Sequence, residues 1–449
     1  GGYSEPFIGT IDDVRVYRGV LTDEEIAATS VAKPVDELAA VPPANRTKAE
    51  SAKLREFFLT HRAPAELQAV RAAWQTAVAE QQAYRELLPT TMIMQDVPGI
   101  RETHLLVRGE YNRPGDKVSA GTPRILPKFA GSNRLDFARW LASPEHPLTA
   151  RVTVNRLWSQ FFGIGLVKTT EDFGAQGELP IHPELLDWLS LEFVRLGWDT
   201  KHIQRKMLES AAYQQSARIS PELLVRDPDN RLLARGPRFR LPAEMLRDAA
   251  LSAAGLLVEN LGGPSVKPYQ PPGLWEDISS DIGGLFNKYE PDAGAGLYRR
   301  GLYTFWKRTV SPPMMTVLDS PTRDICRVNT TRTNTPLQAL NLMNDVTYLE
   351  ASRLLAERML TEGGSEPASR IAWAFRTITA RQPNADELAV LIQGFERRRQ
   401  HYRDHPDDVL PVLTHGAAPV NAHLEKSELA ALTTLASVLL NLDEFVTRE

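Results

Sequence analysis

The sequence has 449 residues, a formal net charge of -4, 42% hydrophobic residues and 24% charged residues. This length allows two or three domains with a large core, and the composition is typical of a globular rather than a disordered protein. Acidic and basic residues are mixed along the chain, so no basic stripe predicts a nucleic-acid partner. No apolar run reaches the roughly 18 to 20 residues that cross a bilayer, so we expect no membrane span.

Cys326 is the one cysteine of the chain. A single cysteine excludes an internal disulfide, a Cys-x-x-Cys-His haem attachment and a multi-cysteine zinc site within these residues. Four histidines, His104, His146, His182 and His202, are scattered along the sequence in a way more typical of caps and surface groups than of metal ligands. We therefore assign neither a cofactor nor a metal site to this chain.

The first 30 residues carry a strand pattern followed by a helix start. Residues 7–17 alternate apolar and polar side chains and are rich in β-branched types, which predicts a strand. Thr22 and Glu25 have the spacing of a capping box and predict a short helix after them. Because a lone strand cannot bury its apolar face, we expect residues 1–30 to be the end of a β-domain whose other strands precede residue 1.

Residues 31–90 are predicted to form a helical linker. Two helical patterns run over about 47–62 and 64–87, and Pro64 suits the first turn of the second helix. The short connection between them favours a helical hairpin.

Residues 91–449 predict a mainly α-helical domain with long irregular loops and few short strands. Strand patterns occur at 104–107 and 303–307, and Gly163 is placed to end a helix. Residues 261–313 form a Gly/Pro-rich and aromatic-rich stretch of the kind that is often functional. Apolar residues recur at helical spacing in seven segments, 149–162, 183–196, 200–213, 242–259, 336–359, 384–399 and 427–440.

Common catalytic signatures are absent from the sequence. It has no Gly-x-Ser-x-Gly elbow, no His-Glu-x-x-His, no P-loop and no Gly-x-Gly-x-x-Gly fingerprint. Whether the protein is an enzyme is therefore left undecided by its motifs.

Four charged residues stand in apolar or irregular surroundings: Arg156, Asp172, Arg247 and Asp319. If they are buried they must be paired, because an unpaired buried charge costs several kcal/mol. One interpretation is a set of internal bridges that tie loops to helices. The other is a single cleft in which guanidinium groups hold a carboxylate, a sulfate or sugar hydroxyls, which makes the four residues catalytic candidates.

Cys326 has two interpretations as well. A free cysteine is most often a small buried hydrophobe, and this is what we expect here. The alternative is a reactive thiol, with the neighbouring Arg323 and Arg327 as the cations that would activate it. The polar run that follows is explained mainly by capping, because Thr335 and Pro336 suit the N-cap and first turn of a helix.

Further ligand-binding candidates are Arg327 and the aromatic residues Trp275, Tyr303 and Trp306. A carbohydrate-binding role for the aromatic residues requires that their rings be exposed, together with that of Tyr298.

Seven segments of the chain, in this order, resemble one family. They are RETHLLVRGEYNRPGDKV, NRLDFARWLASPEHPLTARVTVNRLW, FFGIGLVKTTEDFGAQGELPIHPELLDWLSLEF, DPDNRLLARGPRFRLPAEMLRDAAL, LYRRGLYTFWKRT, CRVNTTRTNTPLQALNLMND and LLNLDEF. The family is the planctomycete-specific C-terminal domain of unknown function that accompanies cytochrome-c-like domains in large secreted proteins. The opening FIGTIDDVRVYRGVLTDEEI resembles the terminal strand of a concanavalin-like, laminin-G-type jelly roll.

These resemblances imply a piece of a longer, exported protein, periplasmic or at the cell surface. A haem c module and most of the jelly roll would lie upstream. They imply a scaffold or partner module in extracellular polysaccharide handling or electron transfer, with a complex carbohydrate and a c-type cytochrome module as partners. The alternatives are a glycan-active enzyme with a carboxylate- and arginine-lined cleft, and a carbohydrate-binding module.

Overall fold

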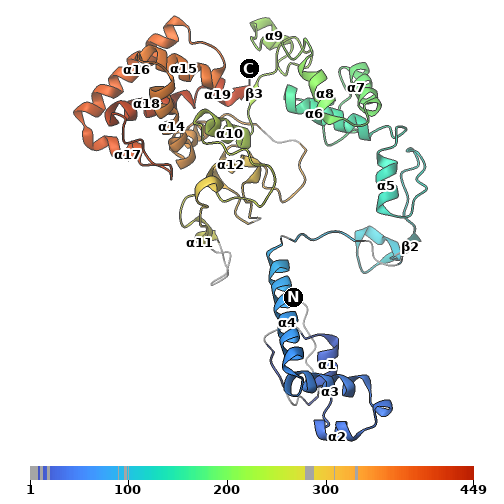
Figure 1. Cartoon of the computed structure of the whole chain (residues 1–449). Coiled ribbons are helices and arrows are strands. Elements are labelled where there is room, and N and C mark those ends of the chain that lie inside the picture. Colours follow the sequence, from blue (N-terminus) through green and yellow to red (C-terminus); the bar gives the residue numbers. More distant parts are fainter. Residues whose placement is uncertain are drawn as a thin grey trace. The chain divides into compact units, whose positions relative to one another are not determined.

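The computed structural model describes residues 9–10, 14–17, 21–88, 90–95, 99, 101–278, 288–307, 309–328 and 332–448 (Figure 1). The chain divides into two compact units, residues 1–117 and 118–449. None of the helices in the described ranges combines the length and the low polarity that a membrane crossing requires.

The described part of the first unit contains α-helices and a two-stranded sheet. The two linker helices are confirmed as α3 and α4, with Thr47 and Glu50 forming a capping box at the start of α3. The strand predicted at 104–107 is confirmed as β1, which pairs with β2. Its elements are α1 (Asp23–Thr29), α2 (Val35–Ala40), α3 (Lys48–His61), α4 (Ala65–Leu87), β1 (Thr103–Leu106) and β2 (Pro114–Val118).

Much of the N-terminal strand predicted at 7–17 lies outside the described residues. Residues 9–10 and 14–17 are described and form no strand. The helix predicted after Thr22 is α1, and its capping box with Glu25 is present. The jelly-roll interpretation therefore stays a prediction.

In the first part of the second unit, α6, α7 and α8 pack around one apolar cluster. Val154 and Trp158 of α6 and Phe193 of α7 belong to this core, which also takes Ile203 from α8. Gly163 ends α6 with a positive φ of 82°, which confirms the predicted helix-ending turn. The helices are α5 (Arg134–Leu141), α6 (Thr149–Phe162), α7 (Pro183–Arg195), α8 (Thr200–Leu208) and α9 (Pro221–Arg226).

The rest of the second unit is organised around α14 and α18, which lie side by side at its centre (Figure 1). Strand β3 pairs antiparallel with β4, so Phe239 lies opposite Arg448. The helices and strands here are β3 (Phe239–Arg240), α10 (Ala243–Ala253), α11 (Leu274–Ile278), α12 (Pro313–Val317), α13 (Pro336–Asn344), α14 (Val346–Glu362), α15 (Pro367–Thr379), α16 (Ala385–Asp404), α17 (Val409–Leu413), α18 (Lys426–Leu439), α19 (Asp443–Val446) and β4 (Thr447–Arg448).

Four predicted elements differ in the structure. The helix predicted at 336–359 is two helices, because Asp345 has an extended backbone and its side chain caps α14. The strand predicted at 303–307 is wrong: a 3-10 turn, Gly301–Tyr303, is followed only by isolated bridges of Thr304 and Lys307. The helices predicted at 242–259 and 200–213 both end early, at Ala253 and Leu208. The mainly helical fold class with few short strands is confirmed.

Candidate functional site

A cavity of about 930 Å³ lies in the second unit. Its described lining comes from the end of α6 with the Gly163 turn, from the segment 217–239, and from residues 326–328 and 332. This volume is within the range of small-molecule sites.

The lining is strongly cationic. Among its described residues are five arginines and one carboxylate, that of Asp229. The Asp229 carboxylate also pairs with Lys168 outside the lining, with 3.1 Å between Nζ and Oδ2. The cavity therefore carries an excess of positive charge that its own acid does not neutralise.

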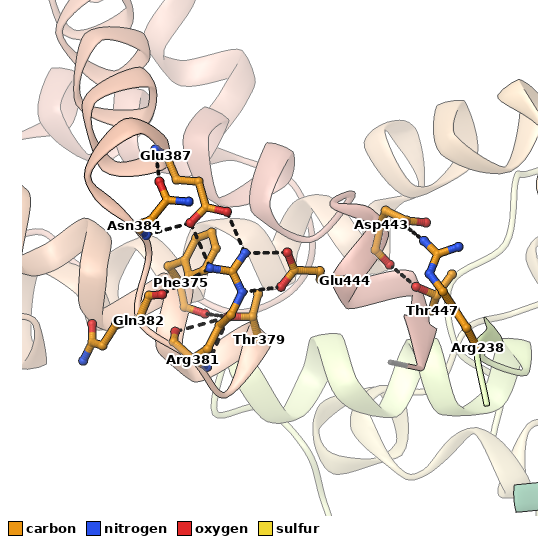
Figure 2. Close-up of polar contacts among 10 residues, drawn as sticks. All are labelled: Arg238, Phe375, Thr379, Arg381, Gln382, Asn384, Glu387, Asp443, Glu444 and Thr447. Carbon is orange, nitrogen blue, oxygen red and sulfur yellow. Dashed lines mark hydrogen bonds and ion pairs between the residues drawn. The ribbon is translucent and has the colours of Figure 1, made fainter. Parts of the chain in front are cut away.

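Two of the arginines are held by the protein itself. Arg235 is buried and donates to the backbone carbonyl oxygens of Asp227 and Pro228, at 2.9 and 2.7 Å. Arg238 forms an ion pair with Asp443 at the start of α19 (Figure 2). These two guanidinium groups brace the cavity wall.

The other three arginines make no ion pair within the described residues. Arg156 on α6 and Arg327 are exposed. Arg332 lies over the ring of Phe239, with 4.2 Å from its guanidinium carbon to the ring centre. Its Nη1 is buried and has no hydrogen-bond partner among the described residues. Burial, and then the charge of Arg240, lowers the pKa of Arg332.

Glycine and strand pairing shape this wall. A Cβ at position 163 would lie 2.8 Å from Cδ1 of Phe239, so only glycine fits where α6 ends against this ring. Phe239 is fixed in turn by pairing with Arg448, which covers the ring of Tyr213 and donates to the backbone oxygen of Phe161. The C-terminal strand thus ties α6 to β3.

Asp319 anchors the segment that leads into the cavity. Its Oδ2 accepts from Arg240 Nη2 at 2.6 Å, from the Thr333 backbone N–H at 2.7 Å and from Gln338 Nε2 at 3.1 Å. Burial by itself raises the pKa of Asp319. The hydrogen bonds from Thr333, Arg240 and Gln338 outweigh this effect, so the pKa lies below its ordinary value.

The structure does not bring the four predicted charged residues to one cleft. Of the four, Arg156 alone lines the cavity. Arg247 is 0% exposed and donates to the backbone oxygens of Leu297 and Arg299, both at 2.6 Å, and its burial lowers its pKa. Asp172 accepts from the Gly174 N–H at 2.7 Å and so stabilises its own turn.

The expectation that Cys326 is buried is wrong, because its side chain is exposed. The residue lies in an irregular segment after Asp319, and the apolar contacts of that region are supplied by Met315 and Leu318 instead. Both Cys326 and Arg327 line the cavity.

The predicted aromatic candidates are covered rather than open. Trp275 is 2% exposed and lies under Lys307, at 4.5 Å from its Nζ to the ring centre. Arg299 covers the ring of Tyr303. Trp306, which is half-buried, lies under Arg323. Each of these three rings therefore has a cation over one face, and the ring of Trp275 is also buried.

The histidines of the described residues have local roles. His146 Nδ1 accepts from the Thr149 backbone N–H and lies near its hydroxyl, at the start of α6. His182 Nε2 lies 3.0 Å from the Arg231 backbone oxygen. No cluster of three or more His, Cys, Asp or Glu residues suited to a metal occurs in the described ranges.

Sequence reasoning missed Arg235, Arg238 and Arg332. The run ARGPRFR, residues 234–240, was the available signal, because three arginines alternate there with small, proline and aromatic residues. What the sequence could not show is that Arg332, nearly one hundred residues later, lies over the ring of Phe239.

The arrangement is suited to binding an anion. Planar guanidinium groups bind carboxylates, sulfates and phosphates through paired, charge-assisted hydrogen bonds. Acid–base hydrolysis of a glycoside ordinarily needs two carboxyl groups, and the described lining has one.

Residues 133–394 match a family model described as PSD1, protein of unknown function (DUF1553). No curated protein matches the chain. No solved structure matches it either.

Proposed function

The chain belongs to the PSD1 family of proteins of unknown function, and we propose that it is a binding module whose arginine-lined cavity takes an anionic glycan. The ligand would be an oligosaccharide segment that carries sulfate or carboxylate groups. The observation that carries this proposal is the set of five arginines around a cavity of about 930 Å³.

The arginines have separate roles in this proposal. Arg235 and Arg238 are already engaged by the protein and keep the wall in place. Arg156, Arg327 and Arg332 have no ion-pair partner in the described residues, so an anionic ligand can pair with them without breaking an internal bridge. Because a cation without an internal ion pair loses no such pair when it binds a ligand, these three groups would supply most of the affinity.

The wider setting of the module rests on resemblance. Its similarity to the C-terminal domain that accompanies cytochrome-c-like domains in secreted proteins supports a role as a partner module in extracellular polysaccharide handling. In such a protein the cavity would hold the polysaccharide near a separate haem-bearing module. Neither this setting nor the planctomycete origin is needed for the cavity to bind an anion.

The two rival functions receive less support from the geometry. A glycan-active enzyme that uses Asp172 and Asp319 would need both carboxylates beside a groove, but one stabilises a turn and the other is held by Arg240. A module that stacks sugars on Trp275 would need a ring that is not buried. Binding through charge is the function that the described residues favour.

The test is calorimetric titration of the 449-residue chain with a sulfated oligosaccharide, an oligogalacturonate and a neutral oligosaccharide of equal length. We expect binding of at least one of the charged ligands, no binding of the neutral one, and an affinity that falls as salt rises. Arg156→Ala and Arg327→Ala should each raise Kd about tenfold, the loss of roughly one charge-assisted contact.

Arg403→Ala is the matched control, because Arg403 is an exposed arginine on α16 that does not line the cavity. It should leave Kd unchanged. Equal binding of charged and neutral ligands, or equal loss in Arg403→Ala and Arg156→Ala, would contradict a specific anion site.

A further inference from the structure

Helix α4 is long and buries none of its residues. It spans Ala65–Leu87, and no residue in it is buried within the described chain. Figure 1 shows it as one long helix that extends away from α3. Several large apolar side chains are nevertheless exposed along it, among them Val70 at 66%, Trp74 at 63% and Tyr84 at 65%. A helix of this length normally gains most of its stability by packing an apolar face.

The apolar residues of α4 follow a seven-residue repeat. Within the helix Leu67, Trp74 and Gln81 are seven apart, and so are Val70, Ala77 and Tyr84. These two series have the spacing of the a and d positions of a coiled coil, which form the seam along which two helices pack. Gln81 is the one polar residue in the seam, and a single polar a position is a known way to fix the register of two helices.

The charges that flank the seam are complementary for one arrangement of two copies. Glu66 and Glu80 occupy g positions, and Arg71 and Arg85 occupy e positions. In a parallel pair each g residue meets the e residue five positions later on the other helix, so Glu66 faces Arg71 and Glu80 faces Arg85. An antiparallel pair sets e beside e and g beside g, which places arginines beside arginines and glutamates beside glutamates.

One of these residues already has a partner within the chain. Arg71 pairs with Glu56 of α3 and donates to the Thr60 hydroxyl. Glu80 and Arg85 make no ion pair within the described residues, and they flank the half of α4 that lies beyond this contact. An ion pair between Glu80 of one copy and Arg85 of the other is therefore the contact that dimerisation would add.

From the bare seam and its flanking charges we propose that α4 is a self-association surface. Its partner is a second copy of this chain, paired in parallel through α4. The proposal does not depend on the arginine-lined cavity, since α4 belongs to the first unit and the cavity to the second.

Sedimentation equilibrium of the full chain over a range of concentrations measures the association. The average mass should rise from the 50.1 kDa of one chain towards twice that value. Trp74→Glu should raise the dimer dissociation constant at least tenfold, because it places a charge in the seam. Trp188→Glu is the matched control, since Trp188 is an exposed tryptophan on α7 in the second unit. It should leave the association unchanged.

Charge reversal tests the parallel arrangement. Glu80→Arg and Arg85→Glu should each weaken the homodimer, because each sets like charges against one another. Mixing the two variants should restore association, since every pair across the seam is then opposite in charge, and the double variant should associate like the parent chain. Circular dichroism should show equal helix content in all of them.

Three outcomes would overturn the proposal. One is a chain that stays monomeric at every concentration tested. Another is dimerisation that Trp74→Glu leaves intact. The third is stronger association of the single reversals, which is the result expected of an antiparallel pair.

Discussion

The carboxylate of Asp319 holds the guanidinium of Arg240 at 2.6 Å, and the two residues are 79 positions apart in the chain. Arg240 is buried, and it also donates to the backbone oxygens of Thr333 and Leu318. One ion pair thereby joins β3 to the segment that carries Cys326.

Asp319→Asn should destabilise the second unit by roughly 1–3 kcal/mol, because the buried Arg240 loses its charged partner. Asparagine tolerates the positive φ of 61° at this position, so the backbone is not the cause. Urea unfolding of the parent and variant measures the loss. Asp386→Asn is the control, since Asp386 is exposed in the first turn of α16.

The same pair predicts a pH dependence. The pKa of Asp319 in the folded protein is below its ordinary value, so its stabilising effect is fully present above the unfolded pKa of about 3.9 and is lost as the pH falls through the folded pKa. The difference in Tm between the parent and Asp319→Asn should therefore be constant near neutral pH and shrink below about pH 4. A Tm difference that grows as the pH falls below about 4 would contradict a stabilising role for the ionised Asp319 carboxylate.

Arg381 also joins separate elements through ion pairs. It pairs with Glu387 at the start of α16 and with Glu444 of α19 (Figure 2). The hydrogen bond from Arg381 is the largest cause that lowers the pKa of Glu387 to about 2. In Arg381→Lys the two paired contacts cannot both form, so this pKa should rise towards its ordinary value of about 4.3. NMR titration of the Glu387 carboxyl carbon measures this pKa. Arg376→Lys is the control, because Arg376 is exposed in the last turn of α15, and this variant should leave the pKa of Glu387 unchanged.

Gly163 should be intolerant of any side chain. Gly163→Ala adds a Cβ 2.8 Å from the Phe239 ring, at a φ of 82°. Gly197→Ala is a close control, because Gly197 has a φ of 64° but no atom within 4 Å of the added carbon. Backbone strain of roughly 1–2 kcal/mol is common to both, and the overlap should cost Gly163→Ala roughly 1–3 kcal/mol more. Equal losses of unfolding free energy would show that the Phe239 contact does not constrain the turn.

Arg332→Leu should separate stability from binding. The Arg332 Nη1 is buried with no partner in the described residues, so replacing the cation by an apolar side chain relieves a desolvation penalty. We expect Tm to stay equal or rise while the affinity for a sulfated oligosaccharide falls. A fall in Tm together with unchanged affinity would assign Arg332 a purely structural role.

Cys326 should react with a thiol reagent in the native protein, because its side chain is exposed. A bound anionic oligosaccharide should slow the reaction, since Cys326 shares the cavity lining with Arg327. Labelling that requires prior unfolding would contradict the exposed position, and labelling that the ligand does not affect would place the ligand elsewhere.

Local features of this fold were predictable from the sequence, whereas its long-range contacts were not. Thr335 and Pro336 start a helix as predicted, because capping depends on residues three positions apart. Cys326 was predicted to be buried from the average behaviour of cysteine, and that average carries no information on one irregular segment. The cavity depends on residues such as Arg238 and Asp443, whose pairing across 205 positions leaves no periodic signal.

The antiparallel pairing of β3 with β4 also sets an order of events during synthesis. Phe239 takes its place opposite Arg448, and Arg238 is balanced by Asp443. A nascent chain that has released residues 149–332 therefore holds all five arginines of the described cavity lining but not the strand that pairs with β3. The strand pairing and the Arg238–Asp443 ion pair can form only after residues 443–448 have left the ribosome, so this wall of the cavity is among the last parts of the second unit to assemble.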